Sequence, residues 1–98
     1  MYQQKIATTA VDRFIEQAPV AQNAFIALDR SAHEEGALGV KTKELIALAV
    51  AHATQCIYCI ELHNDNARAN GATDSEIAET ILVAATVRAG GTVAHGPL

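Results

Sequence analysis

Apolar residues recur at intervals of three and four residues along most of the chain, which is the period of an α-helix. The sequence shows no alternation typical of strands, no internal repeat and no linker. The pattern predicts helices over about residues 3–17 and 19–35, a third that begins near residue 40 or 41, and a fourth over about 57–69. A fifth helix is predicted from Thr73 to the Gly90-Gly91 pair. We therefore expect an all-α fold in which residues 1–98 form a single domain.

Several boundaries of these helices are marked by specific residues. Pro19 suits the first turn of the second helix, and Asn70-Gly71 is a signal for the end of the fourth. Thr73 and Glu76 have the spacing of a capping box at the start of the fifth helix. We expect Gly90-Gly91 to end that helix, with a short helical turn or a frayed end after it.

The apolar positions also predict which helix faces are buried. The third helix is apolar on all sides over residues 45–51, which favours burial all round and, in a chain this small, indicates neighbouring subunits. His33, beside Glu34 and Glu35 at the end of the second helix, is interpreted as a solvated histidine. The inner side of the second helix is expected to carry Val20, Ala24, Phe25, Leu28 and Ala32.

Alanine changes how this apolar content is interpreted. Twenty of the 98 residues are alanine, there is no tryptophan, and Phe and Tyr number only four together. Alanine buries little area at ~25 cal/mol per Å², so the core of one chain should be thin. Alanine also favours helices and lets them approach closely. We therefore expect a homo-oligomer that associates through Ala-rich helices.

Charge and targeting signals exclude several function classes. A net charge of −4 argues against nucleic acid as a partner, because phosphate binding needs a basic face. The nearly uncharged stretch from Leu45 to Ile60 is too short and too polar to span a bilayer. The N-terminal sequence lacks the features of a secretory signal, which predicts a cytoplasmic protein. In that compartment a pair of cysteines three residues apart is more often catalytic or metal-binding than structural.

The two cysteines, Cys56 and Cys59, are the only ones in the chain, and His63 follows four residues after the second. On a helix these three positions share one face. Thiols one turn apart can form a disulfide after modest adjustment, and a helix N-terminus stabilises a thiolate. His63 is placed to take or hold a thiol proton.

Glu44 is a further candidate whose place depends on the path of the chain. In one straight helix Glu44 would lie ~22 Å from Cys59, at 1.5 Å per residue. A turn near Thr54-Gln55 would instead form an antiparallel helix hairpin and bring Glu44 to His63. The sequence then predicts a proton relay from Glu44 through His63 to Cys59. The alternative role for Glu44 is a favourable charge in the first turn of its helix.

The pattern of Glu44, eleven intervening residues, the Cys56–Cys59 motif and His63 resembles the signature of alkylhydroperoxidase D-like proteins in the carboxymuconolactone decarboxylase superfamily. The flanking stretches 41–49 and 70–79 are similar to that family as well. The resemblance covers residues 25–91 and implies an all-helical fold that forms trimers or hexamers. It also implies a thiol-dependent peroxidase or disulfide reductase.

The resemblance assigns catalytic roles to Glu44, Cys56, Cys59 and His63, with Cys59 as the activated thiol. His52 loosely matches a histidine that precedes the pair in many relatives, and is predicted to have a supporting role. The decarboxylase branch of the superfamily lacks the paired cysteines, which argues against lactone chemistry here.

The leading hypothesis is therefore an oxidoreductase that holds no bound cofactor. Cys59 would attack a peroxide or a partner's disulfide, and Cys56 would resolve the product to a Cys56–Cys59 disulfide. An external dithiol, either a lipoyl group or a thioredoxin-like protein, would restore the thiols. The helix dipole favours Cys56 as the more acidic thiol, whereas closeness to His63 and the resemblance favour Cys59. Between the two, we predict that Cys59 has the lower pKa.

Two other hypotheses fit the same residues. The first is a zinc-binding module with Cys56, Cys59 and His63 as ligands and either His52 or Glu44 as the fourth. The second is a structural oligomer whose thiols are simply buried, because free cysteine packs well in cores.

Overall fold

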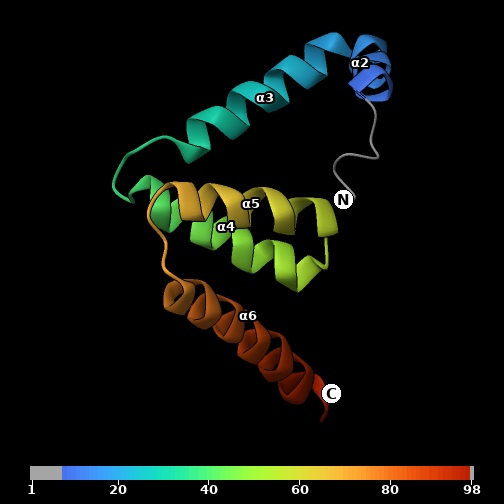
Figure 1. The fold of residues 1–98 in the computed structure, drawn as a ribbon. Helices are drawn as coiled ribbons and strands as arrows, with labels where there is room; N and C mark the ends of the chain where they lie inside the picture. Colours follow the sequence, from blue (N-terminus) through green and yellow to red (C-terminus); the bar gives the residue numbers. More distant parts are fainter. Residues whose placement is uncertain (1–7, 98) are drawn as a thin grey trace.

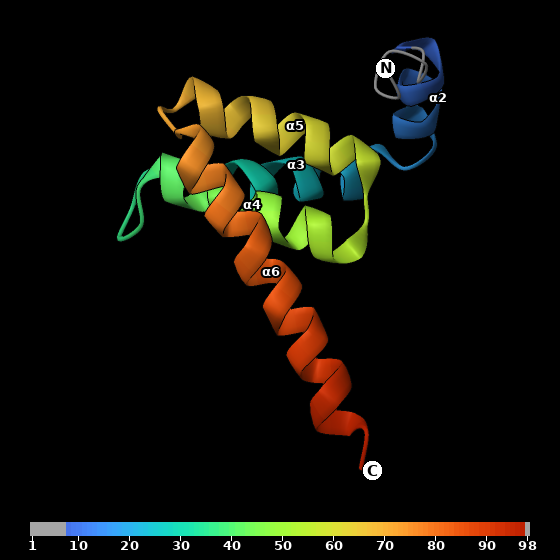
Figure 2. The ribbon, with the colours of Figure 1, turned by 60° about the horizontal axis from the view of Figure 1, so that its bottom comes forward.

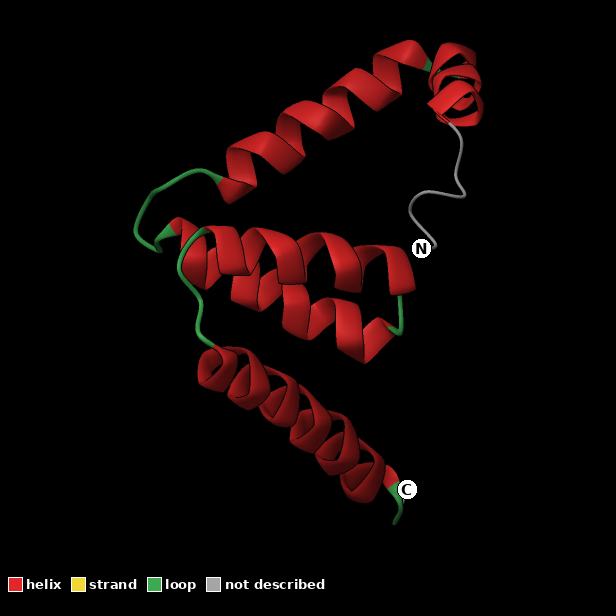
Figure 3. Cartoon of the chain, viewed as in Figure 1, coloured by secondary structure: helices red, strands yellow, loops and turns green. Residues whose placement is uncertain are grey.

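The computed structural model describes residues 8–97, and every element in this part of the chain is a helix (Figures 1 and 3). The predicted all-α fold is confirmed. The predicted start of the first helix near Gln3 lies outside the described residues. The elements are α2 (Thr8–Gln17), α3 (Pro19–His33), α4 (Val40–Thr54), α5 (Ile57–Ala69) and α6 (Asp74–His95).

Helices α4 and α5 form the predicted antiparallel hairpin (Figure 1). The chain reverses at Gln55, whose φ of 57° and ψ of 40° are left-handed. The Gln55 N–H donates to the His52 carbonyl at 3.2 Å, and the Cys56 N–H donates to the Ala51 carbonyl at 3.0 Å. These two bonds are the Schellman closure of a helix end, so a straight helix through this point is excluded.

The same closure ends α5, with glycine at the left-handed position. Gly71 has a φ of 92° and donates to the Arg68 carbonyl at 3.0 Å, while the Ala72 N–H donates to the Ala67 carbonyl at 2.9 Å. Glycine adopts this conformation without the clash of a Cβ atom. The turn after α5 therefore has a clear sequence signal, whereas the turn at Gln55 has none.

Helix α6 begins with the predicted capping box, in which the Thr73 hydroxyl accepts from the Glu76 N–H and the Glu76 carboxylate accepts from the Thr73 N–H. The Lys41 ammonium also donates to Glu76 at 2.9 Å, which joins the starts of α4 and α6. The hydrogen bond from the Thr73 N–H is the main cause that lowers the pKa of Glu76 below its ordinary value, and the hydrogen bond from Lys41 lowers it further.

The core between α4, α5 and α6 is small. Its buried apolar residues in the described part of the chain include three alanines, and only Leu48 among them is a large side chain with no exposed surface. The thin core expected from the alanine content is confirmed for a single chain. The buried apolar residues are Leu48, Ala51, Ala67, Ala72 and Ile77, with Leu45, Ile60 and Ile81 packed around them.

Helix α6 does not end at Gly90-Gly91, so that prediction is wrong. The helix continues to His95, and neither glycine adopts a positive φ. Glycine costs about 1 kcal/mol in a helix relative to alanine, but it ends one only when the chain takes the left-handed conformation. The last turns of α6 point away from the hairpin (Figure 2).

By length and composition alone, α6 is also long and apolar enough to cross a membrane, because its mean hydropathy is 1.3 over a window of 18 residues. Only 6% of that window is buried inside the structure. Its first turns nevertheless pack on α4 through Ile77 and Ile81. The Arg88 guanidinium donates to the Ala53 carbonyl at the end of α4. These contacts make α6 part of the helical domain.

Helices α2 and α3 extend away from the hairpin, with α2 at the far end of α3 (Figures 1 and 2). No residue of α3 is buried, and Phe25 is 62% exposed, so the predicted inner face of this helix is uncovered in one chain. Ile46 and Val50 of α4 are also partly uncovered in one chain, at 49% and 56% exposed, so burial of α4 on all sides would require neighbouring subunits. The radius of gyration is 16.0 Å, against about 13 Å for a compact chain of this length.

The left-handed turn can be tested with Gln55→Gly. Glycine relieves the Cβ strain at this φ, so the free energy of unfolding should rise by about 1 kcal/mol. In a straight helix the same change would lower it by about 1 kcal/mol. The sign of the change in urea unfolding therefore distinguishes the two, and loss of stability would contradict the hairpin.

Candidate functional site

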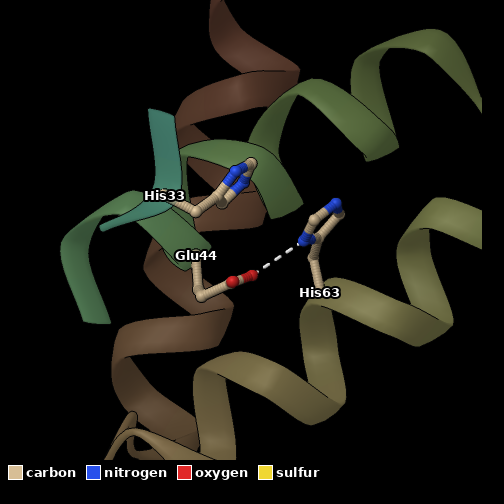
Figure 4. A group of neighbouring side chains, drawn as sticks. All are labelled: His33, Glu44 and His63. Atoms are coloured by element: carbon tan, nitrogen blue, oxygen red, sulfur yellow. Dashed lines mark hydrogen bonds and ion pairs between the residues drawn. The ribbon is translucent and has the colours of Figure 1, made fainter. Parts of the chain in front are cut away.

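Glu44 and His63 meet across the hairpin. The Glu44 Oε2 atom and the His63 Nδ1 atom are 2.7 Å apart (Figure 4). Glu44 is only 6% exposed and shares the buried stripe of α4 with Leu48 and Ala51. A buried carboxylate needs a hydrogen-bonding partner, and His63 supplies it. With Nδ1 donating to the carboxylate, His63 Nε2 is left as a proton acceptor.

The two cysteines are free thiols at the start of α5. Cys56 is the N-cap residue, and its Sγ accepts from the Cys59 N–H at 3.3 Å. The pKa of Cys56 is lowered, first by the Cys59 thiol that donates to its sulfur and then by the Cys59 N–H. The pKa of Cys59 is raised, because its thiol is held by Cys56 and because it is partly buried. The more acidic thiol is therefore Cys56, and the prediction that Cys59 has the lower pKa is wrong. The position of Cys56 at the helix start and the hydrogen bonds from Cys59 are the physical reason.

A cavity of about 460 Å³ lies beside the Glu44–His63 pair. Cys59 and His63 both line it, among mostly apolar side chains such as Ile46 and Val50 of α4. No hydrogen bond joins Cys59 to His63 within the described residues. The cavity has the size and apolar character of a small-molecule site, with a thiol and an imidazole on its wall.

Cys56 is not among the residues that line this cavity, although its sulfur is hydrogen-bonded to the Cys59 thiol. It borders a separate hollow of about 230 Å³ together with Gln55, Ile57 and Tyr58. As an N-cap residue Cys56 is extended rather than helical, with φ of −88° and ψ of 101°. Cys59 and His63 are one turn apart within α5 and do share a face.

His52 does not line this cavity, and its supporting role stays a prediction. It lines a different cavity of about 190 Å³, together with Ile81 and Arg88 between α4 and α6. The structure therefore does not bring it to the thiols within one chain. Among the described residues, no group of possible metal ligands combines His52 with the two thiols.

His33 is a residue of the site that the sequence did not reveal. Its ring stacks on that of His63, with centroids 5.7 Å apart and planes 4° from parallel. It also lines the cavity, so its interpretation as a solvated histidine is wrong. The available signal was the short connection from His33 to α4, which holds the end of α3 near the first turns that carry Glu44.

Comparisons with known proteins were consistent with this geometry. "Uncharacterized protein 4 in cox locus" of Paracoccus denitrificans is 53% identical over 73 residues, which are 74% of this chain and 66% of that protein. An uncharacterized protein of Haemophilus influenzae is 46% identical over 52 residues, covering 53% of this chain and 46% of its own. The chain thus matches only part of the length of these relatives.

Solved structures of other proteins are also similar to this chain. The crystal structure of apo-lpg0406, a carboxymuconolactone decarboxylase family protein from Legionella pneumophila, is 37% identical with a TM-score of 0.78, covering 88% of this chain and 77% of its own. A protein from Methanobacterium thermoautotrophicum is 35% identical with a TM-score of 0.77, covering 84% and 89%. A model of the "Carboxymuconolactone decarboxylase family" matches residues 19–96. Because that match spans most of the sequence, this chain belongs to the carboxymuconolactone decarboxylase family.

Proposed function

We propose that the protein is a thiol-dependent oxidoreductase of the alkylhydroperoxidase D-like type, which reduces a peroxide or a disulfide. The observation that carries this proposal is the 2.7 Å bond between buried Glu44 and His63, beside a cavity lined by Cys59. A structural thiol pair does not need an oriented imidazole at the wall of the same cavity. A relay that moves a thiol proton does.

In the first step His63 Nε2 accepts the Cys59 proton through a water molecule in the cavity, and Glu44 stabilises the imidazolium that forms. The Cys59 thiolate attacks the distal oxygen of the peroxide and breaks the O–O bond. Cys59 becomes a sulfenic acid, and the departing alkoxide takes the proton from His63 to leave as an alcohol.

In the second step the Cys56 thiolate attacks the Cys59 sulfur. The Cys56–Cys59 disulfide forms, and hydroxide leaves as water after gaining a proton. An external dithiol, a lipoyl group or a thioredoxin-like protein, then attacks Cys59 and is itself oxidised to a disulfide. Its two protons return to the enzyme thiols. A disulfide substrate would enter at Cys59 by the same exchange.

The different acidity of the two thiols fits this division of roles. Cys59 lines the cavity, where a substrate can reach it, whereas Cys56 lies outside. A thiol of low pKa is a good leaving group in disulfide exchange. The lowered pKa of Cys56 therefore suits the thiol that leaves when the reductant attacks Cys59.

The exposed apolar residues of α3 and α6 support a further part of the proposal, that the chain works as a homo-oligomer. Val20, Phe25 and Leu28 on α3 and Val87 on α6 are each more than 60% exposed. A second copy that covers them would remove this surface from water. We place the oligomer, a trimer or hexamer, in the cytoplasm.

The acidity of the thiols predicts their order of alkylation. The midpoint of the rate–pH profile should be lower for Cys56 than for Cys59, measured by mass spectrometry of peptides after iodoacetamide pulses. Cys59→Ala removes the donor that lowers the pKa of Cys56 most, so the Cys56 midpoint should rise. An unmoved Cys56 midpoint in this variant would contradict the assigned cause.

Redox activity predicts a specific product of oxidation. One equivalent of an organic hydroperoxide should convert the reduced protein to a form lighter by two hydrogens, with a peptide map that shows a Cys56–Cys59 link. An added dithiol should restore the original mass. Two free thiols after excess peroxide would rule out the proposed function. Cys56→Ser should form no intrachain disulfide and serves as the control.

A further inference from the structure

Three side chains from three helices converge at one point beside the cavity (Figure 4). His33 comes from the end of α3, Glu44 from α4 and His63 from α5. One nitrogen or oxygen atom from each lies within 4.8 Å of the others. We propose that His33, Glu44 and His63 bind a divalent transition-metal ion, for which zinc is the best-matched test ion.

The orientation of His33 supports this site. Its Nδ1 lies 2.8 Å from the backbone carbonyl of Asp29 and 3.4 Å from the Asp29 carboxylate, so Nδ1 carries the proton and donates. The Nε2 lone pair is then available. Histidines that bind metals are held in the same way, through the second ring N–H to a carbonyl or carboxylate. The proton relay makes no use of His33.

Glu44 supplies the negative charge that such an ion requires. Its side chain is nearly buried, and within the described residues only its Oε2 atom makes a hydrogen bond. A bound cation would satisfy both the remaining oxygen and the buried charge. Ligand atoms around tetrahedral zinc lie about 3.4 Å apart, so binding requires rotation of the three side chains and replaces the Glu44–His63 hydrogen bond.

The donor set has a defined chemistry. Two imidazoles and one carboxylate hold zinc at catalytic sites, where a further position stays open, and the same set suits ferrous and cobaltous ions. The neighbouring cavity leaves room for water or a small ligand at that position. This site differs from a zinc site at the cysteines, because neither thiol is needed.

Metal binding would also affect the proposed thiol reaction. The ion takes the Glu44 oxygen and a His63 nitrogen that form the relay, so the loaded protein should lose peroxide turnover until a chelator removes the ion. This consequence rests on the proposed function, whereas the site itself does not.

The test measures metal binding directly on the full, reduced chain. Titration calorimetry with Zn²⁺ should show one ion per chain, and Co²⁺ should give visible bands without a sulfur-to-cobalt charge-transfer band. His33→Ala and the near-isosteric Glu44→Gln should each weaken binding by about 100-fold or more. The double variant Cys56→Ser/Cys59→Ser should bind as tightly as the original protein.

His95→Ala is a matched control for His33→Ala. His95 bonds a carbonyl four residues earlier through Nδ1 at 2.8 Å, as His33 does, but stands on exposed α6. Its removal should leave the affinity unchanged. Absence of binding by the original protein would overturn the proposal. Binding that is lost in the double cysteine variant and kept in His33→Ala would also overturn it, because the ion would then sit at the thiols. Peroxide turnover of metal-free protein tests the thiol function separately.

Discussion

A carboxylate buried in a small core constrains how this chain can fold. Glu44 lies in the stripe of α4 that packs against α5, where an unpaired charge would cost several kcal/mol. His63 is the partner that satisfies it, and the two residues meet only because the chain reverses at Gln55. The pairing therefore links the turn, the hairpin and the site: the interaction that makes the buried charge tolerable also orients an imidazole toward the cavity that holds Cys59.

The rest of the fold is open around this hairpin. Alanines let α4, α5 and α6 approach closely but bury little apolar surface, and α3 reaches the hairpin only near its own end. That end carries His33, which stacks on His63. A helix that contributes little to the core of one chain thus contributes a side chain to the site. Surfaces left uncovered on α3 and α6 are those that association with further copies would bury.

The sequence predicted the helices and the hairpin, because apolar spacing reports helical faces and because a catalytic Glu44 required a reversal before Cys56. It could not predict the exact closure, since a left-handed Gln55 has no signal comparable with Gly71. Gly90-Gly91 predicted a helix end that is not there, because glycine permits a helix end without requiring one. His33 was missed because its neighbours in sequence are charged, whereas its neighbour in space is a ring from α5. Contacts between helices remote in sequence decide such cases.

The proposed function depends on activation of the Cys59 thiol by the Glu44–His63 pair. The most direct test uses the Cys56→Ser background, in which Cys59 is the only thiol and its oxidation stops at the sulfenic acid. With chelator present, stopped-flow mixing with an organic hydroperoxide gives the rate of that single step, with and without Glu44→Gln. We expect this rate to be about 100-fold slower in the Glu44→Gln protein. Equal rates would show that the relay does not act on this thiol.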